Sequence, residues 1–167
     1  PAGVNNFITG TYGTPYPTEV LMAQTWNTDL LYDLGLAMGQ EYADVNNYGV
    51  YGPAMNTHRS AFAGRNFEYY SEDGVLAGKL AAAQVNAMAT KGTYNYIKHF
   101  ALNDQETNRC AFLLTYSNEQ AIREIYLKPF ELCIKNFDGT QIAVMSSFNW
   151  IGTVPACANE DTLTTIL

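Results

Sequence analysis

YNYIKHFALNDQETNR, residues 94–109, is a strand that ends in a concentration of charge. The aromatic and β-branched side chains of residues 94–97 are typical of a strand. The sequence then turns polar at Lys98 and His99, and Arg109 follows after a short loop. Burying an unpaired Lys or Arg costs several kcal/mol, so packing in a core does not explain three such groups together. The stretch predicts a strand with a polar site at its C-terminal end.

The charged groups of this stretch have two interpretations. In the first, Asp104 and Glu106 neutralise the cations. Because nearby cations lower the pKa of a carboxyl group, both acids are then ionised charge partners rather than general acids. In the second, the same donors bind a ligand rich in hydroxyl groups. We favour the second, and we expect Asp104 and Glu106 to lie behind the ligand, where Glu106 orients Lys98 or Arg109.

Composition limits the class of protein. The chain has 167 residues, of which 47% are hydrophobic, enough for one domain with a sizeable core. The net charge is -7, and no basic run is present that would follow a phosphate backbone, so we expect no nucleic-acid partner. The apolar runs fall far short of the roughly 20 residues of a membrane-spanning helix. We therefore expect a soluble chain with no membrane partner.

The cysteines and histidines predict neither a metal site nor a cofactor. Cys110, Cys133 and Cys157 are widely spaced and form no C-x-x-C pair, which argues against a disulfide framework or a structural zinc. His58 and His99 stand at separate places and make no ligand set. The chain is also 13% aromatic, and aromatic rings serve equally as core or as walls for sugar rings.

Apolar residues recur every three to four positions in several segments, which is the pattern of an amphipathic helix. The predicted helices cover residues 28–45, 75–90, 121–134 and a segment after the cap Asn159, whereas residues 1–26, rich in Gly and Pro, are predicted to be loop. Asn27 offers an N-cap for the first helix, and Ser117 with Gln120 forms a capping box for the third. Pro129 lacks an amide hydrogen, so it predicts a kink in the third helix.

Strands alternate with these helices. The predicted strands cover residues 48–53, a run from residue 94, and residues 141–147. Strands joined by single helices form βαβ units, so the fold class is α/β with a parallel sheet. Polar clusters follow the three strands at residues 56–72, 98–109 and 146–150, at the edge where such sheets build their sites. The absence of a G-x-G-x-x-G or Walker motif favours a (β/α)8-type barrel. Because a full barrel takes about 250 residues, we expect a partial one with about three βα units.

Three segments of the chain resemble glycoside hydrolase family 3, on its β-glucosidase branch. They are GRNFEYYSED at residues 64–73, KHFA at 98–101 with NDQETNR at 103–109, and MSSFN at 145–149. The resemblance extends over essentially the whole chain in order. It implies a retaining β-glycosidase in which a (β/α)8-type barrel precedes a smaller α/β sandwich, with the glucosyl unit at their junction. Residues 1–167 are then part of the N-terminal barrel, and the sandwich lies outside this chain.

The resemblance also implies roles for individual residues. The residues expected to bind substrate are Arg65, Lys98, His99, Arg109, Met145 and Phe148. Phe148 replaces a Tyr that is common in the family, and it lacks the hydroxyl of that Tyr. The nucleophilic Asp would lie a short way beyond Leu167 and the acid/base Glu in the second domain, while residues 1–4 resemble the tail of an Asp-Gly-Pro motif. We therefore expect no catalytic residue within this chain and no activity from the isolated chain.

The carboxyl groups of the chain agree with that expectation. Retaining hydrolysis needs two carboxyl groups about 5 to 5.5 Å apart, one ionised and one protonated. Glu72 and Asp73 precede the predicted second helix, where exposed amides favour carboxylates. With Asp104 and Glu106 taken as charge partners, no candidate pair is left.

Lys98 and His99 pose a geometric problem. Neighbouring residues of a strand point to opposite faces, yet the resemblance places both on one sugar. We therefore predict a distorted backbone between them, through a non-proline cis peptide. We interpret His99 as a ligand group because it adjoins Lys98 at a strand end, and His58 as a structural histidine that helps to fix the long loop with Arg59.

Two other functions stay open. In the first, Lys98 forms a Schiff base in an aldolase-like barrel, but this needs a lysine of lowered pKa, which Asp104 and Glu106 nearby would oppose. In the second, the chain is a non-catalytic fragment or a carbohydrate-binding piece. The N-acetylglucosaminidase branch of the family is disfavoured because residues 101–105 lack its loop histidine. The favoured partners are a β-glucoside or β-linked oligosaccharide and the remainder of the same enzyme.

Overall fold

The computed structural model of the protein describes residues 5–6 and 11–167, with side chains from residue 13 onward. Its helices are α1 (Glu19–Ala23), α2 (Thr28–Asp44), α3 (Gly74–Ala89), α4 (Glu119–Ala121) and α5 (Lys128–Lys135). Its strands are β1 (Asn5–Asn6), β2 (Thr11–Tyr12), β3 (Gly49–Val50), β4 (Tyr94–Phe100), β5 (Leu114–Thr115), β6 (Ala143–Ser146), β7 (Trp150–Ile151) and β8 (Val154–Pro155). Short 3-10 turns are η1 (Asn66–Glu68) and η3 (Ala156–Ala158), and π-helical turns are η2 (Ile122–Tyr126) and η4 (Asp161–Ile166). Within these described ranges, no helix has the length and apolar character to cross a bilayer.

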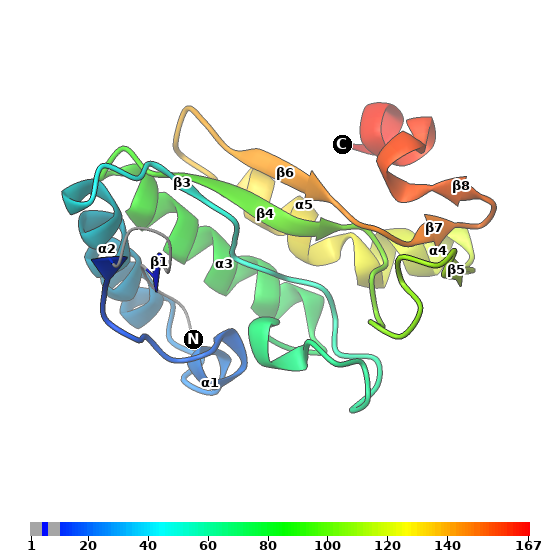
Figure 1. Cartoon of the computed structure of the whole chain (residues 1–167), viewed down its shortest axis with the longest axis horizontal. Helices are drawn as coiled ribbons and strands as arrows, with labels where there is room; N and C mark the ends of the chain where they lie inside the picture. The colour runs from blue at the N-terminus through cyan, green and yellow to red at the C-terminus, as the bar shows by residue number, and fades with distance from the viewer. Residues whose placement is uncertain (1–4, 7–10) are drawn as a thin grey trace.

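A three-stranded parallel sheet in the order β3-β4-β6 organises the molecule. The helix α3 connects β3 to β4, and α5 connects β4 to β6. Both lie along one side of the sheet, and α2 packs against α3 at the edge (Figure 1). Parallel strands joined by crossover helices are βαβ units. The predicted α/β class with a parallel sheet is therefore confirmed, although β3 and β6 are shorter than the predicted strands.

The two faces of β4 differ in their surroundings. On the face toward the helices, Asn95 and Ile97 are buried, and the Asn95 Nδ2 atom lies 3.4 Å from the sulfur of Met88 on α3. On the other face, the rings of Tyr94 and Tyr96 meet edge to face, 5.5 Å apart, and are only half buried. Parallel sheets are normally covered on both faces. The face with the tyrosines therefore has the character of the inner surface of a barrel of which this chain forms a part.

Side-chain caps begin the two long helices as predicted, whereas the third begins differently. The Asn27 side chain accepts a hydrogen bond from the Leu30 amide at 3.0 Å, at the start of α2. At the start of α3, Asp73 accepts from the Val75 amide at 2.7 Å. This agrees with the prediction that a carboxylate before this helix is stabilised by the exposed amides of the first turn. The capping box assigned to Ser117 is wrong, because Asn118, one residue later, is the N-cap of α4.

The third predicted helix is not continuous. It consists of α4, the π-helical turn η2 and α5, and the Leu127 amide donates to the Ile122 carbonyl, five residues back, at 2.8 Å. Pro129 lies in the first turn of α5, where its missing amide hydrogen costs no internal bond. The helix is interrupted near Pro129, as predicted, but the interruption is a π-helical turn before the proline and not a kink caused by its missing amide hydrogen.

The prediction that residues 1–26 are loop is wrong in part. The helix α1 lies within this range and buries Met22 and Ala23 in the core, and β1 pairs with β2 in an antiparallel ladder. A helix of five residues gains its stability from such packing rather than from local propensity, so its sequence carries no clear signal. Residues 1–4, which resemble the tail of a family motif, lie outside the described residues. Near the C-terminus, Asn159 accepts from the Thr162 amide at 3.0 Å and caps the helical segment that begins at residue 160 and continues as η4, as predicted.

Candidate functional site

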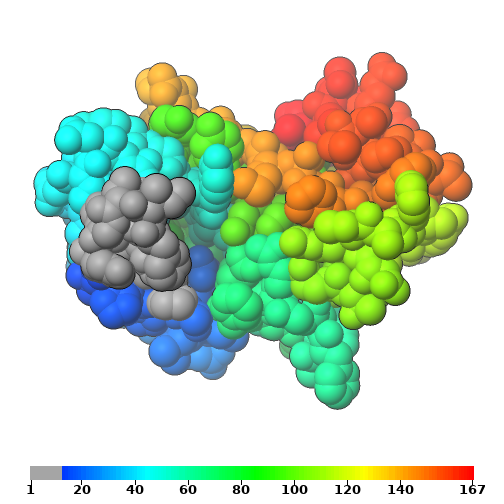
Figure 2. Space-filling view, viewed as in Figure 1, coloured from blue at the N-terminus to red at the C-terminus, as the bar shows by residue number. Residues whose placement is uncertain are grey.

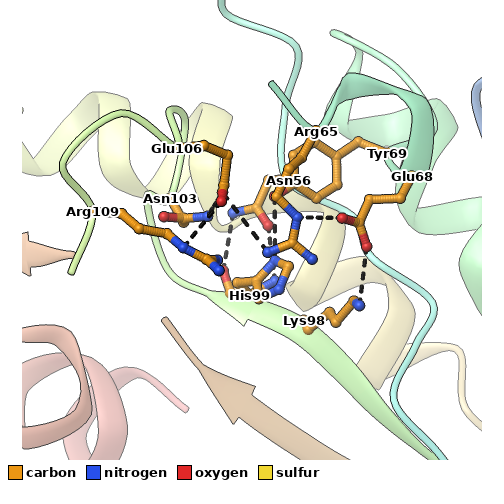
Figure 3. A network of polar contacts seen from close by, with 9 residues as sticks. All are labelled: Asn56, Arg65, Glu68, Tyr69, Lys98, His99, Asn103, Glu106 and Arg109. Atoms are coloured by element: carbon orange, nitrogen blue, oxygen red, sulfur yellow. Dashed lines mark hydrogen bonds and ion pairs between the residues drawn. The ribbon is translucent and has the colours of Figure 1, made fainter. Parts of the chain in front are cut away.

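A polar cluster lies beyond the C-terminal ends of β3 and β4, where two loops meet (Figure 3). It consists of Asn56, Arg65, Glu68 and Tyr69 from the segment after β3, Lys98 and His99 from β4, and Asn103, Glu106 and Arg109 from the loop after β4. Backbone bonds hold these segments in register: the Met55 amide donates to the Lys98 carbonyl at 2.8 Å, and the Glu106 amide to the Ala63 carbonyl at 3.0 Å. The edge of the sheet predicted to carry the polar groups is the edge where they meet.

Five side chains of the cluster form one chain of ion pairs. Glu68 bridges Lys98, at 3.0 Å from Nζ, and Arg65, through a short contact with Nε. Glu106 lies 3.0 Å from Arg109 Nε and 3.8 Å from Arg65 Nη1. The order is therefore Lys98, Glu68, Arg65, Glu106 and Arg109, in which three cations share two carboxylates. Each carboxylate is shared by two cations, and the three cations outnumber the two carboxylates by one positive charge.

Glu68 and Arg65, which are neighbours in this series of ion pairs, stabilise each other's charge. Burial alone would raise the pKa of Glu68, but the hydrogen bond from Arg65 and the charge of Lys98 outweigh it, and the pKa is lowered. For Arg65, burial acts to lower the pKa, and the hydrogen bond and charge of Glu68 reverse this and raise it. Glu68 is thus an ionised acceptor and Arg65 a permanent donor. Neither has the character of a general acid or base.

His99 stands at the base of the cluster and is held by Asn56. The His99 amide donates to Asn56 Oδ1 at 2.8 Å, and Asn56 Nδ2 donates to the His99 carbonyl at 2.9 Å. The peptide bond between Lys98 and His99 is cis, as predicted, and both side chains reach the same cluster. A second non-proline cis bond, between Phe100 and Ala101, had no counterpart in the prediction.

The charge state of His99 differs from the one its sequence neighbours suggest. The side chain is 5% exposed, and its Nδ1 atom lies 3.3 Å from the Tyr69 hydroxyl. Burial, followed by the positive charges of Arg65 and Lys98, lowers the pKa of His99 to about 3. His99, which the sequence places among three groups able to carry a positive charge, is therefore neutral at neutral pH. It offers a neutral imidazole, which has one donor and one acceptor nitrogen.

A cavity of about 230 Å³ opens beside the Lys98 end of the cluster. Lys98 and Glu68 line it together with Glu19 of α1 and Tyr42 of α2. Burial raises the pKa of the Glu19 carboxyl to about 7, with a smaller contribution from the negative charge of Glu68. Glu19 lies in the range predicted to be loop, so sequence patterns did not point to it.

The two predicted charge partners behave differently. Glu106 orients Arg109, as predicted, and also contacts Arg65, but it does not pair with Lys98, whose partner is Glu68. The prediction that cations lower the pKa of Asp104 is wrong. Burial raises that pKa to about 6, Arg59 opposes the rise, and Oδ1 is buried with no hydrogen-bond partner in the described part of the chain. Asp104 takes part in none of the ion pairs described above, and Leu102 and Asn108 on either side of it have positive φ angles.

Of the remaining predicted residues, Phe148 contacts the cluster through Arg109. The Arg109 guanidinium lies 4.9 Å from the centre of the Phe148 ring, and Phe148 is 64% exposed. Met145 is half buried on β6 and belongs to none of the ion pairs described above. His58 Nε2 contacts the Tyr69 carbonyl at 2.9 Å, so its structural interpretation is confirmed, and Arg59 stacks on Tyr126.

Comparison with known proteins shows the family of this chain. The N-terminal domain of glycosyl hydrolase family 3 matches residues 2–167. The chain belongs to this family. Among similar family members, Beta-glucosidase A of Butyrivibrio fibrisolvens is 42% identical over 158 residues, 95% of this chain and 19% of that protein. Probable beta-glucosidase I of Aspergillus clavatus is 37% identical over 169 residues, 100% of this chain and 20% of that protein.

Solved structures of family 3 show the same fold. The β-glucosidase 3B of Thermotoga neapolitana in complex with α-D-glucose has a TM-score of 0.89 and 42% identity, over 93% of this chain and 21% of that one. The Bifidobacterium adolescentis GH3 β-glucosidase has a TM-score of 0.92 and 33% identity, over 99% of this chain and 24% of that one. The chain thus spans about a fifth of the length of the relatives it matches. The partial (β/α)8-type barrel predicted from the sequence is the fold of this family 3 chain.

Several members of the cluster escaped sequence reasoning. Glu68 carries a signal, since it follows Arg65 by three residues, the spacing of an ion pair on a helical turn. Asn56 follows the first strand at the edge where sites are built, but its double hydrogen bond to one peptide unit is visible only in three dimensions. Asn103 donates to Glu106 at 3.0 Å, also three residues apart.

Proposed function

We propose that the protein to which this chain belongs hydrolyses terminal, non-reducing β-D-glucosyl residues with retention. This chain supplies the groups that bind the glucosyl unit. The observation that carries the proposal is the shared chain of ion pairs from Lys98 to Arg109, with the neutral imidazole of His99 beneath it. The relatives named beta-glucosidase and a related structure with bound glucose support this choice of substrate class.

The mixture of donors and acceptors suits a sugar. Each glucose hydroxyl both donates and accepts, so it gains most where donors and acceptors alternate. Lys98 and Arg65 donate, Glu68 and Glu106 accept, and the His99 ring supplies one of each. Hydrogen bonds to charged groups contribute roughly 1.5–3 kcal/mol each, and two or three of them would hold one pyranose ring in a fixed orientation. Arg109, Phe148 and Met145 border the ring in this proposal, and Glu106 and Asp104 lie behind it.

The catalytic carboxyl groups are assigned to parts of the protein outside this chain. A retaining mechanism needs an ionised nucleophile and a protonated acid about 5 to 5.5 Å apart. Glu68 and Glu106, the carboxylates of the cluster, are both committed to ion pairs. We infer that residues 1–167 form part of an N-terminal barrel domain, that a second α/β domain completes the site, and that the isolated chain is inactive.

The rival function as a Schiff-base enzyme loses support from the position of Lys98. Its Nζ atom pairs with Glu68 at 3.0 Å, and an ammonium group in an ion pair has no free electron pair to attack a carbonyl. Borohydride trapping with an aldehyde or ketone substrate separates the two proposals. A trapped adduct on Lys98 would favour the aldolase-like function.

The proposal is tested by hydrolysis assays on the complete protein that contains this chain. It should release glucose from 4-nitrophenyl β-D-glucoside but not from the α-anomer. Lys98→Met and Arg65→Met should each lower kcat/KM roughly 10- to 100-fold, the loss of one charged hydrogen bond. Lys79→Met, on α3, is the matched control and should leave kcat/KM unchanged. Hydrolysis of the α-anomer alone, or unaffected Lys98 and Arg65 variants, would refute the proposal.

A further inference from the structure

The cavity beside Lys98 brings together two carboxyl groups and one amine. Glu19 comes from α1, Glu68 from η1 and Lys98 from β4, and all three line the same space of about 230 Å³. The elements that carry the two acids are in contact, and the blue segment of α1 lies beside the blue-green segment of η1 in the space-filling view (Figure 2). Among the lining residues that the structure describes, Lys98 is the one cation, so the cavity holds more acid than base.

One ammonium group cannot neutralise two carboxylates. Lys98 Nζ lies 3.0 Å from Glu68, which also pairs with Arg65, so Glu68 has two cationic partners. Glu19 takes part in no ion pair within the described part of the chain. Two negative charges in one small space repel each other, and the acid without a partner is the one more readily protonated. Burial, with a smaller contribution from Glu68, accordingly raises the pKa of Glu19 to about 7.

The other groups that face Glu19 do not titrate in the same range. Burial raises the pKa of Tyr42 on α2, and burial followed by the charge of Glu19 raises the pKa of Tyr70 well above its ordinary value of 10.0. The pKa of Glu68 is lowered, as described above. From α3, the uncharged side chain of Gln84 lines the cavity. A change of protonation in this cavity near pH 7 therefore belongs to Glu19.

The protonation state of Glu19 limits what Lys98 can bind. An ammonium group has three donor hydrogens, and Lys98 gives one of them to Glu68. While Glu19 is neutral, the others are available to a sugar hydroxyl. Once Glu19 is ionised, it is a second carboxylate beside the same ammonium group, and carboxylates accept stronger hydrogen bonds than neutral hydroxyls do. Ionised Glu19 therefore competes with the sugar for Lys98.

We propose that Glu19 is a positioning residue for Lys98, and that the glucosyl unit binds to the form of the protein in which Glu19 is protonated. The inference rests on the proposed function, because Lys98 is one of the groups assigned there to the sugar. Ionised Glu19 pairs with Lys98 from within the cavity and leaves fewer donor hydrogens for the sugar. The affinity for glucose should therefore fall as the pH rises and Glu19 loses its proton.

The test measures the dissociation constant of glucose with the complete protein, by calorimetry at pH 5.5 and pH 8.5. The unaltered protein should bind glucose roughly tenfold more weakly at pH 8.5, because one charged hydrogen bond to the sugar is weakened. Glu19→Gln has nearly the shape of the protonated acid and cannot ionise. It should therefore bind glucose at pH 8.5 as tightly as the unaltered protein does at pH 5.5.

Two further variants show whether the effect passes through Lys98. Glu124→Gln, at an exposed glutamate of η2, is the matched control and should keep the pH dependence of the unaltered protein. Lys98→Met removes the group on which Glu19 acts. In that variant the added change Glu19→Gln should leave the dissociation constant as it is at both pH values, and a further effect would show that Glu19 does not act through Lys98.

The outcomes separate this inference from the proposed function. An equal fall in affinity for the unaltered protein and Glu19→Gln, no fall in either, or loss of binding by Glu19→Gln at both pH values would overturn the role of Glu19. Hydrolysis of 4-nitrophenyl β-D-glucoside by the unaltered protein at pH 5.5 would still uphold the proposed function. A complete protein that neither binds glucose nor hydrolyses this substrate at either pH would overturn both.

Discussion

At the scale of single residues, burial decides the charge of several groups more strongly than their sequence neighbours do. His99 follows a lysine, and burial with the positive charges of Arg65 and Lys98 lowers its pKa to about 3. Asp104 follows a cationic stretch, yet burial raises its pKa to about 6. The sequence predicted which residue types gather at the site. It could not predict which of them face water and which face protein, because that depends on where three separate segments meet.

The neutral state of His99 gives a direct prediction. The pKa of His99 is about 3 in the folded chain, below the ordinary value of 6.5. Between pH 6.5 and pH 3 the unfolded chain therefore binds a proton that the folded chain does not, and the free energy of unfolding falls as the pH drops through this range. Nitrogen NMR of the chain labelled at histidine should show His99 in its neutral form from pH 8 down to pH 4. A His58→Gln variant assigns the two signals. A midpoint near 6.5 for His99 would contradict the geometry described.

Glu19 gives a prediction of the opposite kind. Burial, with a smaller effect of Glu68 and against the charge of Lys98, raises its pKa from 4.5 to about 7. Between these values the unfolded chain loses the proton first, so stability falls as the pH rises, by up to roughly 3 kcal/mol. Glu19→Gln should remove this fall in stability, because glutamine does not titrate. Urea unfolding at pH 4.5 and pH 8 measures it, and an unchanged difference between the two pH values in the variant would show that Glu19 is not buried.

At the scale of helices and strands, the patterns that repeat over many residues predicted structure best. The helices α2 and α3 and the strand β4 lie where the sequence placed them, since each has a clear apolar period or strand composition. The failures are short elements and boundaries. The helix α1 depends on the burial of Met22 and Ala23, and the break before Pro129 is a π-helical turn that no repeat encodes. These features arise from tertiary packing, which local sequence does not contain.

The contact between α2 and α3 depends on a glycine. A Cβ atom at Gly35 would lie 2.6 Å from the Gln84 carbonyl oxygen and 2.8 Å from the Ala87 Cβ atom. Gly35→Ala should therefore lower the free energy of unfolding by roughly 1–3 kcal/mol, although alanine favours helix by about 1 kcal/mol. Asp33→Ala, on the exposed side of α2, is the control and should not destabilise the chain. Urea unfolding of both variants measures the difference, and a stable Gly35→Ala variant would mean that the helices do not pack this closely.

At the scale of the whole molecule, the parallel sheet explains why residues distant in sequence form one site. The carboxyl ends of β3 and β4 lie at the same edge, so the segments that follow them meet there, and this could be predicted from the order of the elements. The pairing within the site could not, because Glu68 rather than Glu106 holds Lys98. The half-buried tyrosine face of the sheet agrees with a chain that spans about a fifth of its relatives and forms part of a barrel.

The central claim is that the groups gathered beyond β4 bind a glucosyl unit. A crystal structure of the complete protein soaked with glucose tests it most directly. The account predicts sugar oxygens within about 2.7–3.2 Å of Lys98 Nζ, of a ring nitrogen of His99 and of the Arg65 guanidinium. Glucose bound elsewhere, with all three of these groups out of hydrogen-bonding reach, would contradict it.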